Sequence, residues 1–166
     1  MLYSYAGNFG VYKCPADTFS VPGATSGSTY PHVRSMSMNT WLSPITPYAS
    51  TCTCYYKESN IINPSPANLW VFIDENPYSI NDASFVCEPD IPNWIDCPAS
   101  YHNGAGGITF ADGHAQIKKW LDGAVRQKFA PPVVTMGNPS HVTVPPQQSP
   151  PNDLNWLKSV STVLNN

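Results

Sequence analysis

Oxygen-bearing side chains are concentrated in the stretch that follows the most hydrophobic run of the chain. Residues 74–82 read DENPYSIND, so carboxylates, amides and a hydroxyl lie close together in sequence. Calcium is a hard cation that proteins bind through such oxygens in loops. One interpretation is a calcium site formed by Asp74, Asn76, Asn81 and Asp82. The alternative is a polar turn in which the Asp and Asn side chains accept hydrogen bonds from their own backbone.

Two histidines flank another acidic position. His102 precedes a glycine-rich stretch, and His114 follows Asp112-Gly113 directly. The ring of His102 can lie against this stretch and form a hydrogen bond with a backbone group or a carboxylate, which is a structural role. The alternative is a transition-metal site in which the imidazoles combine with the carboxylate of Asp74 or Glu75.

Paired carboxylates would offer hydrolytic chemistry, with Asp74 or Glu75 as one acid and Asp112 as the other. His102 would belong to the same alternative catalytic set. Nothing in the sequence determines the separation of the two acids, and acidic groups at strand ends are often structural, so we expect no catalytic residue. The motifs G-x-S-x-G, G-x-x-x-x-G-K and H-E-x-x-H are absent, which leaves serine hydrolase, phosphate-binding and zincin chemistry without support.

Aromatic side chains are unusually frequent in the expected loops. Exposed planar rings can stack on sugar faces or form a protein interface. The residues that we expect to be exposed for ligand binding are Trp41, Tyr55, Tyr56 and Trp94. The alternative is that loops poor in aliphatic residues bury their aromatic rings as small cores of their own.

Five cysteines in a polar, proline-rich chain favour an oxidising compartment. Cys87 and Cys97 bracket an irregular loop, and a disulfide between them would stabilise the fold by roughly 2–3 kcal/mol. A second disulfide is expected between Cys14 and either Cys52 or Cys54. The alternative is a zinc site made of these three cysteines and a histidine, although the usual C-x-x-C spacing is missing.

Charge and hydropathy exclude two classes of interaction. Charged residues are 11% of the 166 residues, the formal net charge is −3, and Lys and Arg form no cluster. A phosphate backbone would find no basic surface, which excludes nucleic-acid binding. No run reaches the roughly 20 apolar residues of a membrane span, and Met1 leads into globular-type sequence without a signal peptide. We therefore expect the chain to be part of a longer secreted or surface protein.

The strongest structural signal is a hairpin within residues 101–120, which read YHNGAGGITFADGHAQIKKW. An Asp-Gly pair between alternating stretches is typical of a two-residue type I′ turn. With Asp112 and Gly113 as the loop, Ala111 pairs with His114 and the register of both strands follows. This register predicts one apolar face, which contains Ile108, Phe110, Ala115 and Ile117.

Two further strands are expected. Leu69–Asp74 reads LWVFID, and its length and apolar content are typical of a central strand covered on both faces. Arg34–Leu42 alternates Met36, Met38 and Thr40 with smaller polar residues, which predicts a strand with the methionines facing the core. Between them, Ser43–Asn68 is expected to be a long irregular loop.

These elements predict a small α+β domain built on an antiparallel sheet with long loops. Residues 1–130 would form the globular head, residues 131–151 a proline-rich strap or linker, and residues 152–166 a short helix that docks on the head. Asn152 or Asp153 is expected to cap this helix. Its buried face is expected to contain Leu154, Leu157 and either Val160 or Ser161.

A family resemblance connects several of these segments. His102, nine intervening residues and Asp112-Gly113 match the H-x9-DG motif of the prepilin-type processing-associated domain, which resembles type II secretion pseudopilins. Other segments that fit are VYKCPAD, RSMSMNTWL, VFIDENPYSINDASF, FADGHAQIKKW and DLNWLKSVST. The resemblance implies a pilin-like head that follows a long, processed hydrophobic helix, and it implies a loop calcium of the kind found in major pseudopilins. The helix is absent here, so we expect a globular head, with filament subunits as partners where the helix is present.

The function that we expect is that of an extracellular, surface or periplasmic head domain, structural or adhesive, with a polysaccharide or a surface protein as partner. The alternative is a secreted carbohydrate-active protein that binds or hydrolyses polysaccharide through its loop aromatics and the Asp74, Glu75 and Asp112 carboxylates. Apart from calcium, no cofactor is expected.

Overall fold

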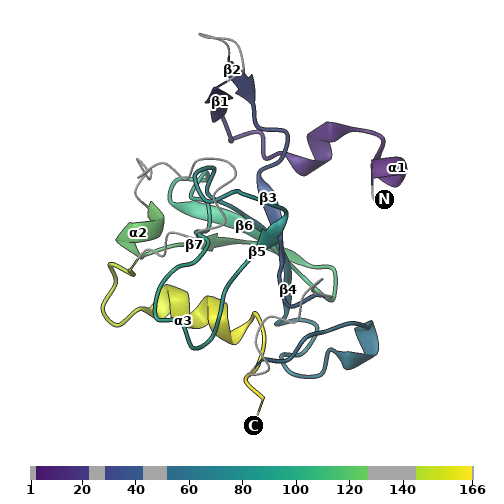
Figure 1. The fold of residues 1–166 in the computed structure, drawn as a ribbon, viewed down its shortest axis with the longest axis vertical. Helices are drawn as coiled ribbons and strands as arrows, with labels where there is room; N and C mark the ends of the chain where they lie inside the picture. Colours follow the sequence, from purple (N-terminus) through teal and green to yellow (C-terminus); the bar gives the residue numbers. More distant parts are fainter. Residues whose placement is uncertain (1–2, 23–28, 43–51, 127–144, 166) are drawn as a thin grey trace.

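A five-stranded sheet forms the body of the domain (Figure 1). The computed structural model describes residues 3–22, 29–42, 52–126 and 145–165. The sheet has the strand order β5-β3-β4-β6-β7, and all neighbours are antiparallel except β3 and β5. The predicted α+β class is confirmed, although the sheet is mixed and not purely antiparallel. Its strands are β3 (Met36–Asn39), β4 (Trp70–Asp74), β5 (Ser84–Phe85), β6 (Ala105–Phe110) and β7 (Ala115–Lys119).

Short helices and a small hairpin surround this sheet. They are α1 (Tyr3–Ala6), the 3-10 helices η1 (Phe9–Tyr12) and η2 (Glu58–Asn60), the hairpin strands β1 (Ser20–Pro22) and β2 (Thr29–Pro31), α2 (Gly123–Arg126) and α3 (Asn152–Ser159). Figure 1 shows α1 and the β1–β2 hairpin projecting from one end of the body, with α3 packed along its side. Among the described helices, none has the length and apolar character needed to cross a membrane.

The predicted central strand is confirmed, but only one of its two faces is covered by the core. β4 lies third in the order of five, and its Trp70 and Ile73 are fully buried. Val71 and Phe72 are only half-buried, so the expectation that both faces are covered is wrong. A register irregularity between Trp70 and Ile73 brings these two side chains to the same side of β4.

The main core lies between this side of the sheet and α3. Leu154 and Leu157 of α3 pack with Trp70 and Phe85, so the C-terminal helix lies against the sheet. The predicted cap is wrong, since Pro151 occupies the N-cap position. The carboxylate of Asp153 instead accepts hydrogen bonds from the backbone N–H groups of residues 121 and 122. These two bonds connect α3 to the segment that follows β7.

The expected orientation of β3 is wrong. Met38 is 38% exposed, whereas Ser37 and Asn39 are buried. The amide of Asn39 donates to the carbonyl oxygens of Trp70 and Ser161, at 3.0 Å in each case. Since these bonds join β3, β4 and the end of α3 inside the core, hydrogen bonding overrides the hydrophobic pattern at this strand.

The predicted hairpin exists, but the predicted register is wrong by one residue. Thr109 pairs with Ala115, and Gly107 pairs with Ile117. Because side chains alternate along a strand, this slip moves the apolar residues of β7 to the opposite side of the sheet. Ile117 is consequently 62% exposed, while Ile108 remains buried in the core.

The turn explains this slip. The loop contains three residues, Ala111, Asp112 and Gly113, and Gly113 adopts a φ of +91°. The backbone N–H of Phe110 donates to the carbonyl of His114, which closes the loop. A two-residue type I′ turn would need positive φ at both loop residues, and Asp112 is not in that region.

Gly106 allows β6 to approach the segment that leads into it. A Cβ at Gly106 would lie 2.6 Å from the carbonyl oxygen of Ala99 and 3.3 Å from the indole nitrogen of Trp120. The Trp120 indole donates to the same carbonyl at 3.1 Å. A side chain at this position would therefore disrupt both the packing and a buried hydrogen bond.

We expect Gly106→Ala to lower the free energy of unfolding by about 1–3 kcal/mol because the backbone must move to make room. Gly123→Ala is the control, since its Cβ would meet the end of the Gln147 side chain and not a backbone atom. Urea unfolding of the two variants measures the difference. An equal loss in both variants would contradict the packing argument.

Candidate functional site

Three side chains of ligand type meet beside the end of β4. Cys14 follows η1, Asp74 ends β4, and His102 precedes β6. His102 Nε2 lies 3.4 Å from Cys14 Sγ and 3.7 Å from Asp74 Oδ2. Their ligand atoms all lie within 4.8 Å of one another, and the described residues contain no other such group of three.

Cys14 is held by the residue that leads into β3. The backbone N–H of Cys14 donates to Ser35 Oγ at 2.6 Å, and the backbone N–H of Ser35 donates to the carbonyl of Tyr12 at 2.9 Å. A turn follows, in which the N–H of Asp17 donates to the Cys14 carbonyl at 3.0 Å. These bonds bury the thiol against the sheet.

Asp74 is positioned by its strand and by β6. It pairs with Met36 in β3, and its Oδ2 accepts a hydrogen bond of 2.8 Å from the backbone N–H of Gly107. Burial raises the pKa of the Asp74 carboxyl, and the Gly107 bond and the neighbouring His102 partly oppose this. Glycine at position 107 leaves the space that the carboxylate occupies.

His102 is presented by a tight turn. Asn103 and Gly104 both have positive φ, at 53° and 81°, and His102 and Ala105 exchange backbone hydrogen bonds around them. The backbone N–H of Ala99 donates to the Asp74 carbonyl at 2.7 Å, which brings the chain before His102 alongside the end of β4. The His102 side chain is 38% exposed, so the group of three opens to solvent.

The surroundings of this group are rich in acidic side chains. Burial and the nearby acidic groups Asp17, Asp74, Cys14 and Glu75 raise the pKa of the Tyr101 hydroxyl, which donates a hydrogen bond to the Glu75 carbonyl. Burial, together with the charge of Asp96, raises the pKa of the Glu75 carboxyl well above its ordinary value. Burial therefore favours the neutral forms of Tyr101 and Glu75, next to the group of three.

The geometry favours metal binding over a nucleophilic relay. In a relay the imidazole uses one nitrogen for the nucleophile and the other for the orienting carboxylate. Here Cys14 and Asp74 both approach Nε2 of His102. A thiol, a carboxylate and an imidazole nitrogen that converge on one point are instead the ligand types of a zinc-class metal.

The structure brings together only some of the residues of the alternative transition-metal site. Asp74 and His102 do meet, but His114 lies at the opposite end of β6, where it stacks on Phe110 with ring centroids 4.3 Å apart. Glu75 directs one carboxylate oxygen to Ser79 Oγ at 2.9 Å. The third ligand-type residue is Cys14, in the place of His114 and Glu75. From the sequence, Cys14 was expected only in a disulfide or in a zinc site with two other cysteines and an unspecified histidine.

The residues of the predicted calcium site form separate local hydrogen bonds. Asn76 Oδ1 accepts from the N–H of residue 78, Asn81 Oδ1 from residue 82, and Asp82 Oδ1 from residue 84. Asp74 belongs to the group with Cys14 and His102. The alternative interpretation, a turn stabilised by its own side chains, describes these contacts.

The carboxylates of the alternative catalytic set are not assembled. Asp74 bonds to Gly107, whereas Asp112 lies beyond Phe110, and Gly107 to Phe110 alone span about 10 Å of strand. Asp112 is exposed, and its pKa is lowered by hydrogen bonds from His114. A retaining or an inverting glycosidase needs its two carboxyl groups within roughly 5–9.5 Å.

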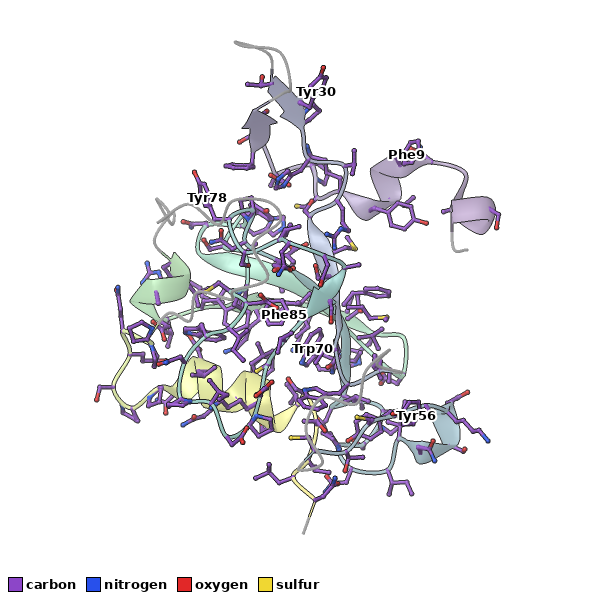
Figure 2. All side chains as sticks on the ribbon, viewed as in Figure 1. Phe9, Tyr30, Tyr56, Trp70, Tyr78 and Phe85 are labelled. Atoms are coloured by element: carbon purple, nitrogen blue, oxygen red, sulfur yellow. The ribbon has the colours of Figure 1, made fainter. Side chains whose placement is uncertain are left out.

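Most of the aromatic residues predicted to bind ligand are buried. Trp41, Tyr55 and Trp94 are almost fully enclosed, so the expectation of exposure is wrong for them. Trp41 and Tyr55 form a second small core with Cys52 and Leu69. Tyr56 is 57% exposed, as expected, and Figure 2 shows it below and to the right of Trp70 and Phe85.

The predicted disulfides are not formed. None of the five cysteines forms a disulfide. Cys87 and Cys97 lie in the main core, and burial raises the pKa of the Cys87 thiol to about 12. Cys52 lies in the second core and Cys54 packs against it, while Cys14 faces His102. Apolar packing replaces the crosslinks as the reason for burying these residues.

Comparison with protein-family models, curated proteins and solved structures finds no match for the chain. The resemblance drawn from the H-x9-DG motif therefore stays a prediction.

We expect all five cysteines to be alkylated by iodoacetamide in denaturant without a reductant, because none of them forms a disulfide. In the native protein, half-buried Cys54 should react before Cys87, whose thiolate is suppressed by burial. Intact-mass spectrometry and peptide mapping measure both results. A denatured mass two adducts short would reveal a disulfide and contradict this prediction.

Proposed function

We propose that this chain is a non-enzymatic, pseudopilin-like head domain of an extracellular, surface or periplasmic assembly. It attaches through the face of the sheet that points away from α3. The observation that carries the proposal is the apolar character of this open face.

The open face presents large apolar side chains from three strands, β3, β4 and β7. Met36 and Met38 of β3, Phe72 of β4 and Ile117 of β7 are all at least partly exposed. A groove of about 320 Å³ follows the face. Its lining includes Met36, Phe72, Gly107, Thr109, Ala115 and Ile117.

Apolar residues that gather on one sheet face are typical of an interaction surface. Thr109 and Ala115 are small, which leaves the groove between the larger side chains. The methionines are flexible and can adapt to the shape of a partner. These features fit an apolar segment of a neighbouring subunit better than a soluble small molecule.

The resemblance agrees with this proposal. In this chain the H-x9-DG motif brackets β6, with His102 before the strand and Asp112-Gly113 in the turn after it. The motif therefore belongs to the strand that contributes Gly107 and Thr109 to the open face. A pilin-like head would use this sheet to contact the helical core of a filament.

We expect Ile117→Lys to reduce association with surface filaments by roughly tenfold or more, because the contact would bury an unpaired charge. The protein is produced in its native cells, filaments are sheared from the surface, and the amount that co-sediments is measured. Ser59→Lys in η2 is the control, since Ser59 is also exposed but lies outside the open face. Equal recovery of both variants would contradict attachment through this face.

A reducing-sugar assay tests the carbohydrate-active alternative. We expect no release of reducing sugar from a panel of polysaccharides, because the carboxylates are separated and three of the four candidate aromatics are buried. The assay compares the wild type with Asp112→Asn. Sugar release by the wild type that is lost in the variant would replace the structural proposal with the enzymatic one.

A further inference from the structure

We propose that Cys14 Sγ, Asp74 Oδ2 and His102 Nε2 form a binding site for one zinc-class divalent metal ion. The bound ion connects the N-terminal segment to the sheet and to the turn before β6. The site is independent of the proposed filament contact, although Asp74 also lines the groove of the open face.

The distances fit tetrahedral coordination. Metal–ligand bonds of about 2.0–2.3 Å at tetrahedral angles place neighbouring ligand atoms roughly 3.3–3.7 Å apart. The two distances from His102 Nε2 are 3.4 Å to Cys14 Sγ and 3.7 Å to Asp74 Oδ2. The third pair, Cys14 Sγ and Asp74 Oδ2, lies within 4.8 Å, which a small rotation of the Cys14 side chain can shorten.

The ligand chemistry selects the class of ion. Thiolate and imidazole are preferred by zinc and its transition-metal neighbours, whereas calcium and magnesium prefer oxygen. Only one of the three groups supplies oxygen. A thiolate, a carboxylate and a neutral imidazole together carry two negative charges, which match a divalent cation.

The supporting contacts hold two of the ligands in place. The Gly107 N–H fixes Asp74 Oδ2, and Ser35 holds the backbone of Cys14. Such outer contacts orient metal ligands and strengthen binding. The exposed side of His102 leaves a fourth coordination position for water or for a side chain of a partner.

Coordination would join distant parts of the chain. Cys14 and His102 are separated by 88 positions in the sequence. The backbone of Cys14 is bonded to Ser35, just before β3, while His102 precedes β6, and β3 and β6 flank β4 in the sheet. Since the unfolded chain lacks this arrangement, metal binding stabilises the folded state. Such a link would hold the N-terminal segment, which Figure 1 shows projecting from the body, to the sheet.

The test uses the full chain, purified with chelator and then titrated with Zn²⁺ and with Co²⁺. We expect one equivalent to bind, a thiolate-to-cobalt charge-transfer absorption to appear, and Zn²⁺ in hundredfold excess over its Kd to raise Tm by about 5–10 °C. Cys14→Ser should abolish the absorption, and both Cys14→Ser and His102→Gln should abolish the Tm rise. Circular dichroism verifies that each variant is folded.

Matched controls make the assignment specific. Cys54→Ser removes a half-buried thiol beside the second core, and His114→Gln removes an exposed imidazole at the far end of β6. Both should behave as the wild type. Three outcomes overturn the proposal: no stoichiometric binding, cobalt–thiolate absorption that survives Cys14→Ser, or a Tm rise with Ca²⁺ alone that Cys14→Ser leaves unchanged.

Discussion

The register of β6 is the constraint on which both the core and the candidate site depend. In the pairing of β6 with β4, Ile108 faces the core opposite Ile73, and Gly107 faces the other side. Gly107 then offers its N–H to Asp74 and leaves room for its carboxylate. A shift by one residue would exchange the two faces and remove Asp74 from its partner.

Only one face of the sheet packs against the core, because buried polar groups determine which side of β3 points inward. Ser37 and Asn39 are buried, and the Asn39 amide bonds to carbonyl oxygens of β4 and of the segment after α3. A buried amide without partners would be costly, so these bonds determine which side of β3 faces inward. The methionines consequently lie on the open face, where their apolar surface is available to a partner.

The candidate site lies at the margin of this open face. Asp74 contributes to both, since it lines the groove and approaches His102. Its neighbours Glu75 and Tyr101 connect the site to the buried end of β4 through the Tyr101–Glu75 hydrogen bond. An ion at this position would stabilise the same strand end that supports the proposed attachment surface, so the two proposals concern adjacent but separate features.

Local signals in the sequence determined the existence of β4, of the β6–β7 hairpin and of α3, because apolar runs, an Asp-Gly turn and helical periodicity act over a few residues. Strand alternation alone does not distinguish one side of the sheet from the other, so the exposure of Ile117 and Met38 depended on turn length and on the buried bonds of Asn39. The meeting of Cys14 with His102, 88 positions apart, was decided only by the tertiary structure. Local sequence patterns do not predict which distant segments the packing of the whole chain brings together.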